Sequence, residues 1–242
     1  MKRSGTMMKA AAIGLLCGGS PLLAGEARSV AISSNGGSAT ATSTSVGNGS
    51  SLSVAGATNG GVAVSDSVAL AGRRGRANSR SVAMADFGTA VSRSRADARG
   101  SFGGSAFAES DSTAVTIGGI AQSRSDAIAD GVFHGRAVSR SASTALSLFG
   151  HARSTSRAAS HGLLGGEAVS ISDSLADAEG GFASSDVEAV SSADLYGHAS
   201  SDGIGMSVTG VARKAPVRVY AESRSSRWGK SRSRASMVKI RR

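Results

Sequence analysis

Small residues occupy every second position over most of this chain, in phase with a series of glycines. Between about residues 75 and 210, the residue two positions after each of these glycines is an alanine: Ala77, Ala90, Ala106, Ala121, Ala137, Ala152, Ala168, Ala183 and Ala199. A two-residue period is that of a β-strand, whose successive side chains point to opposite faces. The pattern predicts strands with one face of alanine and serine, and no sustained apolar stripe with a 3.6-residue period indicates a helix.

The glycine spacing predicts a 31-residue repeating unit. The glycines at 88, 104, 119, 135, 150, 166, 181 and 197 follow one another in steps that alternate between sixteen and fifteen. Each unit then holds two strands and two unlike turns, a longer one such as 131–134 and a shorter one such as 116–118. We expect glycine to supply the positive φ values that these corners need.

A shorter form of the unit precedes these repeats. Glycines at 25, 37, 49 and 61 follow one another in steps of twelve, so the coils are expected to widen along the chain. The pairs Asn35-Gly36 and Asn59-Gly60 are strong signals for tight turns.

Two all-β architectures fit this pattern. In a two-sheet β-solenoid resembling a β-roll, each 31-residue unit is one coil with a thin Ala/Ser core. Equivalent residues of successive units would then stack, and Phe102, Phe133, Leu164 and Leu195 would form one ladder along an edge. In the alternative, an antiparallel sheet of hairpin repeats, the Ala/Ser face would need a second layer. The solenoid is favoured because it buries the small face within one chain.

The composition excludes an ordinary globular core. The 242 residues include 33 glycines and 4% aromatic residues, and the hydrophobic fraction of 40% is mostly alanine and valine. Burial of one methyl-sized group contributes about 0.8 kcal/mol, against roughly 1.5–3 kcal/mol for a leucine or phenylalanine side chain. Stability must therefore come from long backbone ladders and close sheet packing, as in solenoids.

The chain divides into four predicted segments. Residues 1–24 resemble a secretory signal peptide, with a basic start, an apolar stretch over 10–16 and a small-residue cleavage site before Gly25. Residues 25–87 form a short-repeat β region, 88–212 the 31-residue repeats, and 213–242 a basic C-terminal tail or cap. The single cysteine, Cys17, lies in the first segment, so the processed chain would have neither disulfides nor thiolate metal sites.

The net charge of +10 is concentrated near the C-terminus. From residue 213 onward Glu222 is the only acid, whereas residues 25–212 carry a small negative net charge. The basic residues there are the candidate polymer-binding residues: Arg213, Lys214, Arg218, Arg224, Arg227, Lys230, Arg232, Arg234, Lys239, Arg241 and Arg242. They suit an anionic polysaccharide or lipopolysaccharide, or they belong to a structural cap; nucleic acid is the disfavoured partner.

No residues point to catalysis, a cofactor or a metal. Serines such as Ser92, Ser123, Ser139, Ser154 and Ser170 fall at inward positions, where a hydroxyl can bond to its neighbours in a ladder. The four histidines, His134, His151, His161 and His198, lie at or near turns and lack ligand spacing. We therefore expect a non-enzymatic protein with no cofactor and no transmembrane span.

The alternating Ala/Ser repeats, including residues 29–32, resemble the β-roll heads of bacterial trimeric adhesins and secreted amyloid-forming matrix proteins, although their repeat length differs, and no family is assigned. We expect a secreted β-repeat structural protein of the cell surface or extracellular matrix that is adhesive or associates with itself, as a homo-oligomer or fibre. The alternative is a monomeric solenoid that binds an anionic extracellular polymer through its basic C-terminal tail.

Overall fold

The computed structural model is a parallel β-solenoid built from two sheets. It describes residues 25–34, 36–72, 75–100, 105–131, 136–148, 150–162, 167–179, 182–193, 198–209, 216–225 and 230–241. These residues form strands and turns and no helix. Every strand pair between neighbouring coils is parallel, so the predicted solenoid is confirmed and the antiparallel hairpin alternative is wrong.

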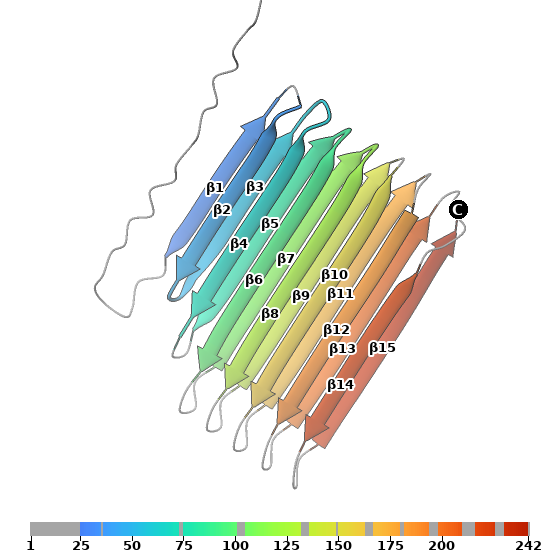
Figure 1. The fold of residues 1–242 in the computed structure, drawn as a ribbon. Coiled ribbons are helices and arrows are strands. Elements are labelled where there is room, and N and C mark those ends of the chain that lie inside the picture. The colour runs from blue at the N-terminus through green and yellow to red at the C-terminus, as the bar shows by residue number, and fades with distance from the viewer. Residues whose placement is uncertain are drawn as a thin grey trace, which may run out of the picture.

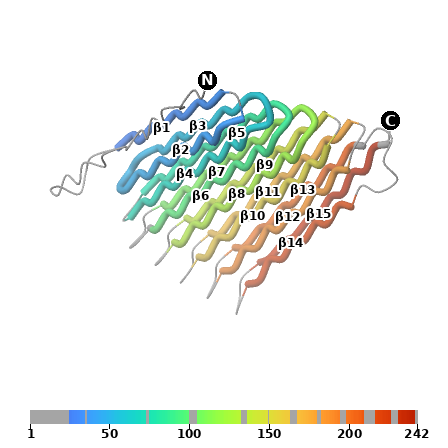
Figure 2. The backbone as a smooth tube through the Cα atoms, turned by 45° about the horizontal axis from the view of Figure 1, so that its top comes forward, coloured from blue at the N-terminus to red at the C-terminus, as the bar shows by residue number. Residues whose placement is uncertain are grey.

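Successive strands alternate between the two sheets, so one strand from each sheet makes a coil (Figure 1). The eight-stranded sheet holds β1 (Glu26–Ser33), β3 (Gly49–Ala57), β5 (Arg76–Asp86), β7 (Ser105–Ile117), β9 (Arg136–Leu148), β11 (Glu167–Glu179), β13 (His198–Thr209) and β15 (Lys230–Arg241). The seven-stranded sheet holds β2 (Ser38–Val46), β4 (Val62–Ala71), β6 (Thr89–Gly100), β8 (Ile120–Gly131), β10 (His151–Gly162), β12 (Phe182–Ala193) and β14 (Val217–Ser225). Figure 2 shows these coils following one another along a flattened body.

The register between coils reproduces the repeat length and its widening. Near the start of the solenoid, Glu26 pairs with Ser50, which lies twenty-four positions further along the chain. In the middle, Ile120 pairs with His151, which lies one full 31-residue unit further along. Because each pair is in register, equivalent side chains stack in columns along the solenoid. The ladder expected for Phe102, Phe133, Leu164 and Leu195 lies outside the described residues.

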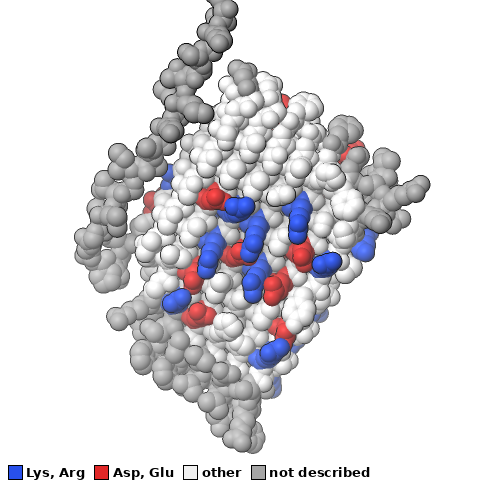
Figure 3. Space-filling model, in the orientation of Figure 1, with Lys and Arg blue, Asp and Glu red and all other residues white. Residues whose placement is uncertain are grey.

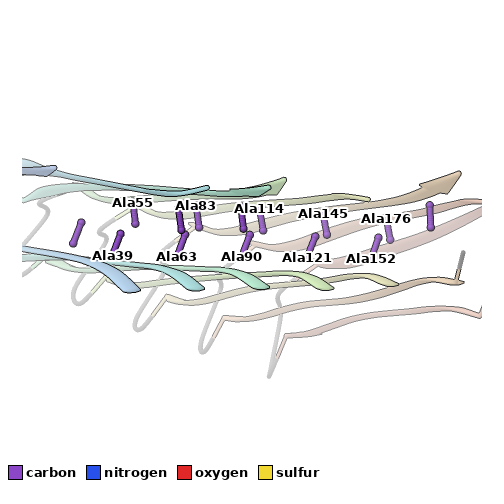
Figure 4. Close-up of a cluster of buried hydrophobic side chains, with 14 of the residues drawn as sticks. Ala39, Ala55, Ala63, Ala83, Ala90, Ala114, Ala121, Ala145, Ala152 and Ala176 are labelled. Carbon is purple, nitrogen blue, oxygen red and sulfur yellow. The ribbon is translucent and has the colours of Figure 1, made fainter. Parts of the chain in front are cut away.

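Alanine and serine fill the space between the sheets, as the alternation predicts. The nine alanines that follow the repeat glycines are between 0 and 3% exposed. Figure 4 shows alanines of the two sheets pointing toward one another, among them Ala114 and Ala145 from one sheet and Ala121 and Ala152 from the other. Methyl groups leave little space, so the two backbones approach closely and exclude water from the interior.

The core serines bond across the gap between the sheets. Ser123 of β8 donates toward Ser112 of β7, with its hydroxyl 2.6 Å from the carbonyl oxygen and 3.0 Å from the hydroxyl oxygen. Ser154 of β10 repeats the contact with the carbonyl oxygen of Ser143 at 2.6 Å. The expected ladder is therefore mainly a zipper between facing strands. It pairs most of the buried hydroxyls, which are costly to bury unpaired, although those of Ser191 and Ser201 have no partner among the described residues.

The short corners, at the top of Figure 1, use glycine in two ways. Gly118 has a φ of +68°, and Asn59 and Gly60 have φ values of 57° and 82°. In contrast, Gly119 faces the preceding coil, where an added Cβ would lie 1.9 Å from the carbonyl oxygen of Gly88. The expectation that corner glycines supply positive φ is therefore wrong for Gly119, which is needed because the backbones approach so closely.

The core changes near the C-terminal end. Among the described residues, Val187 of β12 is the largest fully buried side chain, with 1% of its surface exposed. It faces Gly203 of β13, whose added Cβ would lie 3.2 Å from Val187 Cγ1 and 3.2 Å from Val219 Cγ1. A missing side chain on one sheet is thus balanced by larger ones on the other, which keeps the gap filled.

Candidate functional site: the basic last coil

The strands β14 and β15 turn most of the predicted basic tail into the last coil of the solenoid. Four of the candidate polymer-binding residues, Arg213, Lys214, Arg227 and Arg242, lie outside the described residues. The other seven lie on these two strands: Arg218, Arg224, Lys230, Arg232, Arg234, Lys239 and Arg241. The structure therefore brings the seven to one end of the solenoid.

The alternation of β15 divides its basic residues between two faces. Lys230, Arg232 and Arg234 fall two residues apart on the outer face, and each is exposed. Lys239 is in register with Ser207, whose side chain is completely buried and bonds to the carbonyl oxygen of Ala183. Register partners in a parallel sheet share a face. Lys239 is therefore on the inner side, yet it is exposed because β15 ends its sheet.

A shallow hollow lies where β11, β13 and β15 begin. Glu167, His198, Lys230 and Arg232 contribute to its lining, so two of the candidate residues meet here. Neither Lys230 nor Arg232 forms an ion pair with a described residue, whereas Glu167 lies 3.0 Å from the guanidinium of Arg136. The hollow thus offers two cations and a partly neutralised carboxylate to a polar group from solution.

On β14 a polar cluster neutralises one of the candidate cations. The Tyr220 hydroxyl donates to Glu222, which also forms an ion pair with Arg224. The hydrogen bond to Glu222 raises the pKa of Tyr220, and the same bond lowers the pKa of the Glu222 carboxyl. Arg224 therefore contributes less free positive charge than the row on β15 does.

The remaining outer surface carries charges of both signs. Figure 3 shows basic and acidic side chains interleaved in a band across one face, with a broad uncharged area above it. On the seven-stranded sheet, Arg157 pairs with Glu188 at 3.3 Å, and Arg124 pairs with Asp126 at 3.1 Å. Such exposed pairs contribute little to stability, about 0–1 kcal/mol each. The strong excess of positive charge thus lies on β15 of the last coil, whereas β11 of the same sheet carries only acids.

One acid on the eight-stranded sheet, Asp173, has a raised pKa. Partial burial raises the pKa of the Asp173 carboxyl, and the nearby carboxylate of Asp202 adds to the rise. Two acids placed close together disfavour ionisation of each other. The protonated form of Asp173 is therefore more favoured in the folded chain than in an unfolded one.

Exposed apolar side chains line the short corners, a feature that the alternation analysis missed. They flank the corner glycines on successive coils: Val62, Phe87, Ile117, Ile120 and Leu148. The signal was present in the sequence, since large apolar residues recur on either side of these glycines. A row of exposed apolar side chains on a solvent-facing surface is typical of a surface that contacts another molecule.

Three of the four histidines considered as metal ligands lie among the described residues. His151, His161 and His198 lie on strands, and His134 falls outside the described residues. Within the described part of the chain, no group of three or more His, Cys, Asp or Glu side chains is placed to hold a metal ion. The same residues contain no helix long and apolar enough to cross a membrane.

Comparison with protein-family models, with curated proteins and with solved structures finds no match to this chain.

Proposed function

We propose that this protein is exported and serves as a non-enzymatic structural element of the cell surface or extracellular matrix, where it adheres or associates with itself. The observation that carries the proposal is the filled interior: an Ala/Ser coil repeats along most of the described solenoid, and larger side chains fill the gap near its C-terminal end. A core of this kind supports a long, stiff body and leaves binding to the outer faces and ends. The apolar corner row and the flat outer faces are the surfaces on which contacts would form.

The export step rests on residues 1–24 and is tested separately. The full chain is expressed in a secreting bacterial host, and the N-terminus of the exported product is determined by mass spectrometry. We expect the product to begin at Gly25, and Leu15→Arg to abolish export because a charge interrupts the apolar stretch. A matched Ser20→Arg change outside that stretch should be tolerated. An uncleaved chain that stays in the cytosol would contradict the proposal.

Self-association is tested by sedimentation velocity of the exported protein over a hundredfold range of concentration. We expect the weight-average sedimentation coefficient to rise with concentration. A constant value, equal to that of the monomer, would instead favour the second candidate function.

That second candidate is a monomeric solenoid that holds an anionic extracellular polymer with its basic last coil. The supporting observation is the exposed outer row of Lys230, Arg232 and Arg234, which lacks ion pairs among the described residues. Attachment through exposed charges weakens steeply with salt, because the screening length falls from about 10 Å at 0.1 M to about 3 Å at 1 M.

The test measures retention on heparin-like and lipopolysaccharide resins in low and high salt. Replacement of the β15 row by glutamine should shift elution to lower salt. A control removes the same charge from the seven-stranded sheet by glutamine at Arg93, Arg124 and Arg153. Equal shifts for the two triple variants would reject the last coil as the attachment site, and a chain ending at Ala212 should also lose retention.

A further inference from the structure

The two ends of the solenoid are open sheet edges. The strand orders place β1 and β2 at one end, the N-terminal coil, and β14 and β15 at the other, the last coil. Each end strand has one edge with no strand partner among the described residues. Unpaired backbone N–H and C=O groups at such an edge are a template for pairing with another chain.

The last coil carries features that oppose pairing. The Lys239 side chain is on the inner side of β15, where another stacked coil would bury it between alanines and serines. The outer row on the same strand adds three further cations. Inward charges and edge lysines are devices by which sheet proteins prevent association at an edge.

The N-terminal coil has none of these features in its described residues. Its only charged side chains, Glu26 and Arg28, pair with each other at 3.0 Å. The inner positions of β1 and β2 carry only alanine and serine. Ile32, Val46 and Val30 are 83, 73 and 66% exposed, more than any other large apolar side chain described. The described part of this edge is therefore neutral, has exposed apolar side chains on β1 and at the end of β2, and lacks the inward lysine of the last coil.

We propose that the N-terminal coil pairs with the N-terminal coil of a second copy of this chain, forming a closed head-to-head dimer. The proposal specifies the partner and geometry of the self-association that was proposed above. A head-to-tail contact would bury Lys239 at the joint, whereas two N-terminal coils bring no unpaired charge together. A twofold axis makes the interface self-complementary, so association stops at two copies.

The twofold axis also sets the direction of pairing. The axis is perpendicular to both sheets, so it places β1 beside β1 of the second copy and β2 beside β2. The two strands of each pair are antiparallel, and both sheets continue from one copy into the other. Val30 and Ile32 of the two copies then lie on the same outer face and shield one another from water. The backbone groups at both edges gain partners at the same time.

Cysteine cross-linking tests this arrangement in the full chain, with Cys17 replaced by serine so that every introduced thiol is unique. Val30→Cys places a thiol near the middle of β1, and Ser236→Cys places one near the middle of β15. We expect mild oxidation to join two Val30→Cys chains and to leave Ser236→Cys chains single. Cross-links in a mixture of the two variants would reveal head-to-tail stacking and overturn the proposal.

A second measurement follows the dimer by sedimentation equilibrium. Ala31→Lys transfers the inward lysine of the last coil to β1, and should raise the dimer dissociation constant about tenfold or more because the lysine would be buried at the joint. Met237→Lys makes the same charge change on the inner side of β15 and should leave the constant unchanged. Thr42→Lys, on the outer face of β2, provides a second disruption if Ala31→Lys alters the circular dichroism.

Three results would overturn the proposal. One is a monomer at all concentrations, and another is a dimer unaffected by both lysine variants of the N-terminal coil. The third is cross-linking between Val30→Cys and Ser236→Cys chains in a mixture, which would show head-to-tail stacking. Self-association that persists while Val30→Cys fails to cross-link would reject this geometry but leave the broader structural proposal standing.

Discussion

Substitution of one corner glycine tests how closely the coils approach. In Gly119→Ala, the new Cβ would lie 1.9 Å from the carbonyl oxygen of Gly88. Relief of that overlap must move the two backbones apart by about 1 Å or more, since a carbon and an oxygen in contact lie above about 3 Å. The movement would weaken the hydrogen bonds from Ile120 N to Gly88 O, at 3.1 Å, and from His151 N to Gly119 O, at 2.9 Å.

Two weakened backbone hydrogen bonds set the size of the expected effect. At a net value of about 0.5–1.5 kcal/mol each, their loss would lower the free energy of unfolding by about 1–3 kcal/mol. With a urea m-value of about 1–3 kcal/mol per molar, the unfolding midpoint should fall by about 1 M. Far-UV circular dichroism in a urea titration measures the shift, and hydrogen exchange at the His151 amide shows whether the damage starts at this corner.

Gly56→Ala is the matched control. Gly56 lies on β3, and an added Cβ there would have no heavy atom within 4 Å. A glycine replaced where the backbone accepts alanine is expected to gain about 0.4–1 kcal/mol, because the unfolded chain loses freedom. Equal stabilities of the two variants would refute the inference that Gly119 is required by close backbone approach.

Three other outcomes are expected. Ala137→Leu should overpack the gap between the sheets and cost about 1–3 kcal/mol in urea unfolding, while Arg136→Leu on the outer face should change stability by less than about 1 kcal/mol; equal costs would contradict the alternating faces. Deletion of residues 119–149 removes one strand from each sheet and should leave a folded, β-rich chain by circular dichroism. Deletion of 119–134 removes only one strand and should disrupt the alternation of successive strands between the two sheets. Similar spectra for both deletions would reject the two-strand coil. Burial and a neighbouring acid raise the pKa of Asp173, so its ionised form destabilises the fold and Asp173→Asn should be more stable than the parent at neutral pH. This difference in the free energy of unfolding should disappear as the pH falls through the raised pKa to below 3.8. A difference that is independent of pH would contradict this.

The strands and their repeat could be predicted because both depend on local pattern. A two-residue period specifies a strand, and the recurring alanine exemplified by Ala121 specifies the face that must be buried. The 31-residue register followed because one coil stacks on the next without a change of phase. The inward position of Lys239 was also available from the sequence, by continuing the alternation of β15 to its end.

Contacts between the two sheets could not be predicted from the alternation of residues along the sequence. The bond from Ser123 to Ser112 depends on which strands face each other, and strand spacing along the chain does not contain that information. The pairing of Val187 with Gly203 is a match between two sheets, visible only once they are packed. Gly118 is needed for its positive φ, whereas its neighbour Gly119 is needed because a Cβ would overlap the preceding coil. Composition cannot distinguish these two reasons for a glycine.

The core of methyl and hydroxyl groups has a thermal consequence. Unfolding raises the heat capacity through exposed apolar surface, by about +0.45 cal/mol/K per Å², and lowers it through exposed polar surface, by about −0.26. Ordinary domains reach about 12–15 cal/mol/K per residue because large apolar side chains dominate the balance. Here buried serine hydroxyls and backbone groups offset alanine methyls, so the increment per residue should be smaller. A small increment flattens the curve of stability against temperature, and the solenoid should lose little of its stability on cooling toward the freezing point.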